Sequence, residues 1–143
     1  MPTSAPTSPY RDHPTAAELQ RALREAPVLA RDETASAHFL GLPVVWRTRF
    51  FDAIECGRGP IKQLSFTQRG LHSHARSDNP IYCFLDLTQD DGFRELRRGR
   101  RVDLYGRIAS IDVTLGTTLE LDRYVVLQET LLDRWVEKMD SRG

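Results

Sequence analysis

Cysteine, net charge and long apolar runs are all scarce in this chain of 143 residues. Its two cysteines, Cys56 and Cys83, are fewer than a small disulfide-stabilised secreted domain uses. The 20 basic and 20 acidic residues cancel, which excludes a globally basic nucleic-acid-binding protein but not a local basic patch. No apolar run approaches the roughly 20 residues of a membrane helix, and the N-terminus lacks the basic and apolar regions of a secretory signal. We therefore expect a cytoplasmic chain with both thiols free and no membrane association.

Motifs for catalysis and for cofactors are also missing. The sequence contains no G-x-S-x-G, no C-x-x-C and no H-x-x-x-H pattern. The turn-like run Gly57-Arg58-Gly59 is not followed by the Lys-Ser/Thr pair of a phosphate-binding loop. His72 and His74 have a spacing that allows two imidazoles to share a metal, but a solvated polar loop explains them more simply. We therefore expect no enzymatic activity, no cofactor and no metal site.

What is present fits one globular domain with a charge imbalance in its middle. Apolar residues make up 40% of the chain and charged residues 28%, and a chain of this length buries enough surface for one core. Residues 42–76 contain six basic and two acidic residues. The net charge of +4 in this segment leaves room for a local anion-binding surface.

Proline and helical periodicity divide the N-terminal third. Four prolines in residues 1–14 predict a disordered tail. Thr15 and Glu18 have the spacing of a capping box, and the apolar residues that follow recur at helical intervals until Pro27 ends the pattern. A second short helix is predicted from Asp32 to Leu40.

Alternating apolar and polar residues then predict five strands with a helical turn after the third. The predicted strands are Pro43–Asp52, Ile61–Thr67, Pro80–Leu87, Arg101–Ile111 and Thr117–Leu127, and the predicted turn is Asp90–Arg98. Residues 128–143 form the last predicted element, an amphipathic helix that we expect to dock on the barrel or to form a homodimer. Its apolar stripe consists of Leu131, Leu132, Trp135, Val136 and Met139.

Two segments repeat one frame, Gly-x-x-φ-x-φ-x-small-x-φ, where φ is apolar. The first segment runs from Gly41 to Phe50 and the second from Gly99 to Ile108, with Thr48 and Gly106 at the small position. A small residue in mid-strand allows the sharp coiling that a small barrel needs. With a Cys-containing strand between them, Ile81-Tyr82-Cys83-Phe84, these segments resemble OB-fold proteins of the tRNA_anti-like type, in which Gly usually stands where this chain has Thr48.

The resemblance covers about residues 15–127 and implies a fold class: an all-β core, a five-stranded OB-fold barrel, with a leading N-terminal helix. It says almost nothing about activity, because an OB barrel is a reused scaffold. The C-terminal helix is not part of the usual pattern. We expect the six apolar residues of the two frames to be buried inside one barrel: Val44, Trp46, Phe50, Val102, Leu104 and Ile108.

Basic and aromatic residues supply the candidate binding surface. Arg47 and Arg49 share one face of the first strand, and Tyr82 and Phe84 share one face of the third. Aromatic rings flanked by arginine bind single-stranded nucleic acid by stacking and by phosphate contacts. Arg58 joins this set because the loop between the first two OB strands borders the usual ligand cleft. The alternative is that Tyr82 and Phe84 pack beneath the N-terminal helix.

The arginine-rich turn 97–101 allows two interpretations, a phosphate contact or a solvated turn.

Taken together, the sequence predicts a non-enzymatic OB-fold binding module with one of two partners. Single-stranded nucleic acid is favoured by the fold and by the +4 segment. A protein partner, with the module as an accessory or regulatory domain, is favoured by the zero net charge and by an aromatic content of only 8%.

Overall fold

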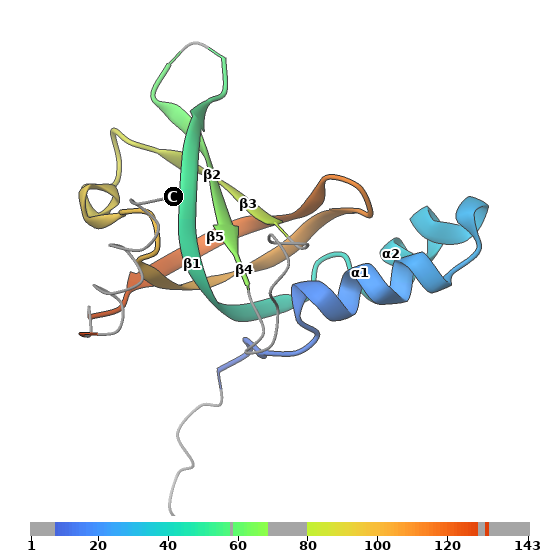
Figure 1. Ribbon diagram of the computed structural model, residues 1–143. Helices are drawn as coiled ribbons and strands as arrows, with labels where there is room; N and C mark the ends of the chain where they lie inside the picture. The colour runs from blue at the N-terminus through green and yellow to red at the C-terminus, as the bar shows by residue number, and fades with distance from the viewer. Residues whose placement is uncertain (1–7, 58, 69–79, 129–130, 132–143) are drawn as a thin grey trace, which may run out of the picture.

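The computed structural model describes residues 8–57, 59–68, 80–128 and 131 (Figure 1). Within these residues, two helices come first, and five strands follow with a helical turn after the third, as the sequence predicts. The elements are α1 (Ala16–Glu25), the 3₁₀ turn η1 (Val28–Ala30), α2 (Arg31–His38), β1 (Pro43–Glu55), β2 (Ile61–Thr67), β3 (Pro80–Asp86), the 3₁₀ turn η2 (Gly92–Glu95), β4 (Arg101–Asp112) and β5 (Gly116–Val126).

The five strands close into a barrel in the order β1-β2-β3-β5-β4, with β4 returning to pair with β1. The β3–β5 contact is parallel and short, joining Ile81 to Thr117 and Tyr82 to Thr118. The other neighbouring pairs are antiparallel. A closed barrel of five strands is thus confirmed.

The two repeated frames lie side by side as β1 and β4. Trp46 pairs with Leu104, and Thr48 pairs with Val102. Five of the six residues expected inside the barrel are at most 1% exposed, and Phe50 is half-buried against the same cluster. The expectation that both frames line one barrel is therefore confirmed.

The small residues of the two frames are used differently. A Cβ on Gly106 would lie 2.5 Å from the carbonyl oxygen of Glu120, so only glycine allows β4 and β5 to approach this closely. Thr48 is 2% exposed and its hydroxyl donates a 2.8 Å hydrogen bond to the carbonyl of Val102. The Thr48 side chain, at the small position of the first frame, thus has a hydrogen-bonded place in the core.

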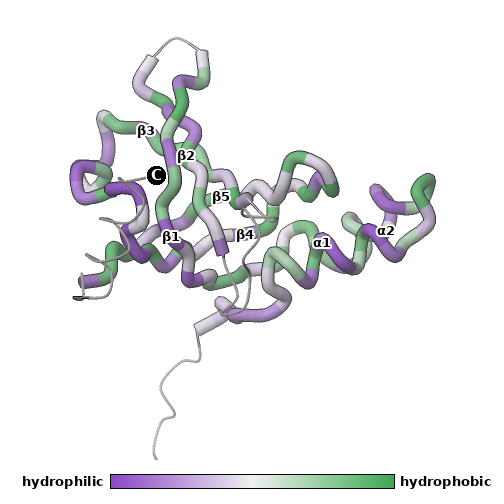
Figure 2. Tube along the Cα trace, viewed as in Figure 1, coloured by the Kyte–Doolittle hydropathy of each residue, from purple (hydrophilic) through white to green (hydrophobic). Residues whose placement is uncertain are grey.

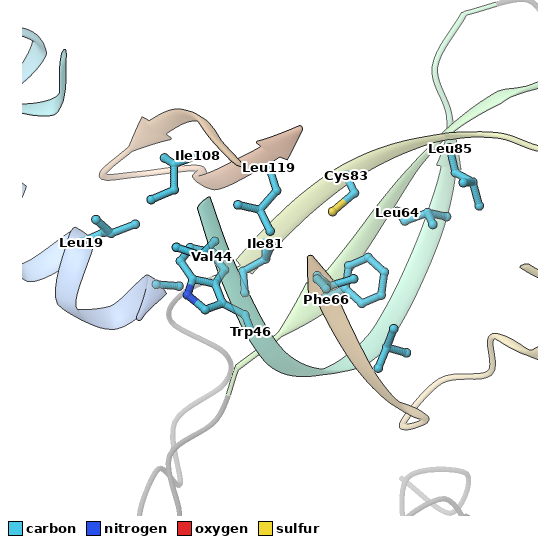
Figure 3. Packing of buried hydrophobic residues seen from close by; sticks show 13 residues of the cluster. Leu19, Val44, Trp46, Leu64, Phe66, Ile81, Cys83, Leu85, Ile108 and Leu119 are labelled. Carbon is cyan, nitrogen blue, oxygen red and sulfur yellow. The ribbon is translucent and has the colours of Figure 1, made fainter. Parts of the chain in front are cut away.

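Helix α1 covers one end of the barrel. Its capping box is complete: the Thr15 hydroxyl accepts from the Glu18 amide, and the Glu18 carboxylate accepts from the Thr15 amide. Leu19 and Leu23 are at most 1% exposed, and Figure 3 shows Leu19 directed toward Ile108 and Val44. The capping box begins α1, and the buried side of the helix adds Ala16 and Leu19 to the barrel core.

The structure describes residues 8–14 of the predicted tail, and this part contacts the barrel. The Arg11 carbonyl accepts a 2.9 Å hydrogen bond from the Val45 amide, extending the β1 edge. The Tyr10 hydroxyl donates to Asp122 at 2.7 Å, and its ring meets Tyr105 edge-on. Proline content carries no information about these partners on β1, β4 and β5, so the sequence did not predict the contacts.

Helices α1 and α2 form an arm that extends away from the barrel (Figure 1). Hydrophobic residues lie at its far end, as Figure 2 shows between the two helices. Val28 is 70% exposed and Leu29 is 99% exposed. The end of the arm therefore presents exposed apolar side chains.

Among the described residues, η2 and its neighbours close the other end of the barrel. Phe93 and Leu96 pack against Leu87 and the core from this side. The predicted C-terminal helix lies outside the described residues, apart from Gln128 and Leu131. Leu131 is 82% exposed, so this member of the predicted stripe is not buried on the barrel. None of the described helices has the length and apolar character needed to cross a membrane.

Candidate binding surface

Strands β1, β2 and β3 present one continuous outer face to solvent. On β3, Cys83 and Leu85 are buried, which turns the alternating Tyr82 and Phe84 outward. Gln63 on β2 pairs with Phe84 and therefore shares its side of the sheet. The same reasoning along the registers defines the outer face: Asp52, Ile54, Ile61, Gln63, Ser65, Tyr82, Phe84 and Asp86.

The apolar members of the outer face are unusually accessible. Ile54 is 54% exposed and Phe84 is 47% exposed, and they flank Gln63 in one row across the three strands. Ile61, at the start of β2, is 45% exposed beside this row. Tyr82 is half-buried in the next row, opposite Ser65. The aromatic pair therefore does not pack beneath α1, which covers an end of the barrel.

A β-bulge in β1 determines which of its side chains belong to the outer face. The register shifts between Phe50 and Asp52, so Phe50 stays against the core while Asp52 and Ile54 face outward. The extra residue, Phe51, is 47% exposed. The Arg98 guanidinium stacks over its ring at 4.8 Å and donates to its carbonyl at 3.2 Å. The bulge thus changes which side chains β1 shows to solvent.

The predicted arginines do not join the aromatic row. Arg47 makes a two-pronged contact with Asp103 on β4, with Nε–Oδ1 at 3.1 Å, and this contact raises the pKa of Arg47. Arg47 also lies seven positions before Ile54, about 23 Å of extended strand at ~3.3 Å per residue. Arg49 donates to the Gly99 carbonyl at 2.8 Å. Arg58 lies outside the described residues.

The arginine-rich turn 97–101 is tied to the protein itself. Arg98 stacks on Phe51 as described, and Arg100 donates to the Leu127 carbonyl at 2.9 Å. Arg101 donates to the Gln128 carbonyl at 3.3 Å. These contacts give the turn a structural role, which neither reading of the sequence included.

The charged groups on the outer face are acidic. Asp86 accepts hydrogen bonds from the Thr88 hydroxyl and the Thr88 amide, which lower its pKa and keep it ionised at neutral pH. Asp52 is the second acidic member of the face. At the nearby end of the hairpin, Lys62 is paired with Glu55 at 2.8 Å. The described part of this surface therefore carries no excess of positive charge.

Reactive groups are not gathered anywhere in the described ranges. Those ranges contain no cluster of three or more His, Cys, Asp or Glu side chains able to hold a metal. Cys83 is fully buried, and burial raises the pKa of its thiol to about 12. Cys56 is exposed at the end of the β1–β2 hairpin. His72 and His74 lie outside the described residues.

The inner side of the same hairpin borders a cleft of about 490 Å³ between β1, β2 and η2. Its apolar walls come from the hairpin and from the β3–β4 connection, and its rim is polar. The lining consists of Phe50, Asp52, Ala53, Glu55, Lys62, Leu64, Leu87, Phe93 and Leu96.

Sequence reasoning missed both the cleft and the aliphatic part of the outer face. Ile54 lies beyond the predicted end of the first strand and Ile61 begins the predicted second strand, and their shared side depends on where the bulge occurs. The signal available was the pair of isoleucines flanking a turn cluster. Neither a scan of protein-family models nor a search of curated proteins finds a match to this chain.

Proposed function

We propose that this protein is a non-enzymatic binding module built on an OB-type barrel, and that its outer face docks a partner protein. The resemblance of its two coiling frames to tRNA_anti-like proteins supports the OB assignment, as does the closed five-strand order. An OB-type barrel binds its ligands on strands 2 and 3 and on adjoining loops. The outer face lies on those strands.

The exposure of Ile54, Ile61 and Phe84 on adjacent strands is the observation that supports a protein ligand. A contiguous group of apolar side chains with polar neighbours is typical of a protein interface, where aromatic residues are enriched and charge lies at the rim. Gln63 and Ser65 lie between the apolar side chains and offer hydrogen bonds. Asp52 and Asp86 supply charges at the edge.

Single-stranded nucleic acid is the competing ligand, and the electrostatics disfavour it. Binding to a polyanion depends on cations that replace condensed counterions. The outer face instead carries Asp52 and Asp86, and Arg47 is engaged by Asp103. Tyr82 and Phe84 remain able to stack on bases, so the experiment has to separate the two ligands.

The first test is a pull-down from a native lysate of the source cells, carried out with and without nuclease. We expect the wild-type protein to retain a protein partner that the Phe84→Ser variant loses. Leu115 is 66% exposed in the β4–β5 turn, so Leu115→Ser is the matched control and should retain the partner. Equal retention by both variants, or loss of the partner on nuclease treatment alone, contradicts the proposal.

The second test is a fluorescence-anisotropy titration with labelled single-stranded oligonucleotides at low salt. The proposal predicts no binding up to high micromolar protein. Binding that weakens with log salt at about −0.7 per phosphate contact, and that weakens further in Phe84→Ser, would identify nucleic acid as the ligand instead.

A further inference from the structure

Strand β5 keeps a free backbone edge beyond its short contact with β3. The parallel pairing of these strands joins Ile81 to Thr117 and Tyr82 to Thr118, and the two strands diverge from there (Figure 1). On its other side, β5 pairs with β4 as far as Val126. Within the residues that the structure describes, the second half of β5 is therefore paired along one edge only.

The hydrogen bonds to β4 show which backbone groups lie on the free edge. The Leu127 amide donates to the Arg101 carbonyl at 2.9 Å, so Leu127 and Val125 direct their backbone groups toward β4. The amides and carbonyls of Tyr124 and Val126 consequently point away from β4, and no described residue forms a hydrogen bond with them. Donors and acceptors on alternate residues are what an edge strand offers to another strand.

The free edge borders a groove of about 430 Å³. One wall of the groove is β5 from Asp122 to Val126, and the other is η2 with Asp90 just before it. The two walls meet closely at one point, because a Cβ on Gly92 would lie 2.8 Å from the Tyr124 hydroxyl. From Asp122 to Val126 the edge is about 13 Å long at ~3.3 Å per residue. This length accommodates a short extended segment.

The side chains around the groove are mainly acidic. Asp90 and Glu95 lie on the η2 wall, and Asp122 lies on the β5 wall. The basic residue of the described lining is Arg123, whose guanidinium lies 3.9 Å from the centroid of the Tyr105 ring on the outer side of β4. The groove therefore carries a net negative charge, which complements a basic partner.

We propose that the free edge of β5 takes up an extended, basic segment of a partner protein as an added strand. Strand addition obtains its affinity from main-chain hydrogen bonds and its specificity from alternate side chains. The backbone of the segment pairs with Tyr124 and Val126, and its lysine and arginine side chains meet the carboxylates of Asp90, Glu95 and Asp122. The site lies apart from the outer face, and the inference does not rest on the function proposed for that face.

A fluorescein-labelled octapeptide of alternating lysine and valine, titrated by anisotropy against the full chain, tests the proposal. We expect saturable binding that weakens about tenfold in Val126→Pro, the size of one lost hydrogen bond, and by less than about threefold in Val126→Ala. Proline removes the donor on the free edge without removing a bond to β4, whereas alanine keeps that donor. Glu95→Gln should weaken binding, and Phe84→Ser, on the outer face, should not change it.

Amide hydrogen exchange locates the bound peptide and provides the test if Val126→Pro fails to fold. In the free protein, the amides of Tyr124 and Val126 should exchange faster than those of Arg123 and Val125, which face β4. The peptide should slow the exchange of both edge amides.

Four results would overturn the proposal. The first is protection of the edge amides in the free protein, which would mean that another part of the chain covers the edge. The second is absence of peptide binding, or equal binding of an octapeptide of alternating glutamate and valine. The third is unchanged binding in a folded Val126→Pro variant. The fourth is loss of binding in Phe84→Ser, which would assign the peptide to the outer face.

Discussion

Gly106 allows β4 and β5 to approach each other closely. The atom facing its missing side chain is the backbone oxygen of Glu120, which cannot rotate away as a side chain would. The register between β4 and β5 also shifts here, between Tyr105 and Gly106. The residue is therefore constrained by space, without any unusual φ angle.

We predict that Gly106→Ala lowers the free energy of unfolding by about 1–3 kcal/mol, the usual cost of inserting a methyl group into a packed site. Ser110→Ala, at an exposed position on the same strand, should change it by less than about 0.5 kcal/mol. Urea denaturation followed by circular dichroism measures both values. An unchanged midpoint for Gly106→Ala would mean that β5 moves aside without cost.

Single residues were predictable from sequence where strand alternation decides their direction. Tyr82 and Phe84 face outward together, and Trp46 and Leu104 face inward, as their patterns indicate. The Arg47–Asp103 ion pair was not predictable, because it depends on the register between two strands whose paired residues lie 56 positions apart in the chain. Charge composition alone left Arg47 as a candidate phosphate contact.

At the scale of elements, α1 begins in a charged cluster as well as a capping box. His13 Nδ1 lies 2.6 Å from Glu18 Oε1, and the same carboxylate accepts from the Thr15 amide. Contact with Glu18 raises the pKa of His13, and contact with His13 lowers the pKa of Glu18. The link joins residues 8–14 to the helix that covers the barrel.

This pair predicts a pH window of stability. Its contribution is complete from the ordinary Glu pKa of 4.5 to the ordinary His pKa of 6.5. It is lost above this range as pH rises through the raised native pKa of His13, and below it as pH falls through the lowered native pKa of Glu18. The difference between wild-type and His13→Ala urea midpoints should therefore be largest near pH 5–6. A difference that does not vary with pH contradicts the assignment.

The ends of helices and strands were predictable from sequence where a local signal sets them. They were not predictable where tertiary contacts set them. Thr15 and Glu18 fixed the start of α1. The helical turn predicted over Asp90–Arg98 shortens to Gly92–Glu95, because Phe93 and Leu96 anchor one turn and nothing beyond it is apolar. The first strand continues three residues past its predicted end, since β2 supplies hydrogen-bond partners that the sequence pattern does not show.

One side of the β1–β2 hairpin belongs to the outer face, and the other side lines the cleft. Ile54 and Gln63 belong to the outer face, while their neighbours Ala53 and Leu64 line the cleft. Any group that fills the cleft therefore contacts the strands that carry the proposed docking surface.

At the scale of the whole molecule, one cysteine lies at the surface and the other in the interior. Cys56 is exposed at the hairpin end, and Cys83 lies in the middle of the barrel core (Figure 3). The raised pKa of the Cys83 thiol, about 12, also removes the reactive thiolate at neutral pH. Reaction of Cys83 thus requires that the barrel open.

We predict that a disulfide reagent at pH 8 titrates one thiol rapidly and the second only at the rate of barrel opening. Urea should accelerate the slow phase and leave the fast phase unchanged. Cys56→Ser should remove the fast phase alone. Two rapid equivalents in the absence of urea would show that the β3 interior is accessible.

Because β4 returns to pair with β1, the nascent chain has unpaired strand edges until its last two strands are made. β1, β2 and β3 precede residue 101 in the chain, so both outer edges of this three-stranded sheet lack neighbours when they leave the ribosome. β4 then covers the free edge of β1, and β5 covers that of β3. Because unpaired edges are templates for pairing with other chains, a synthesis halted before Val126 leaves an aggregation-prone product. The last two strands therefore complete the fold and also protect the nascent chain from its neighbours.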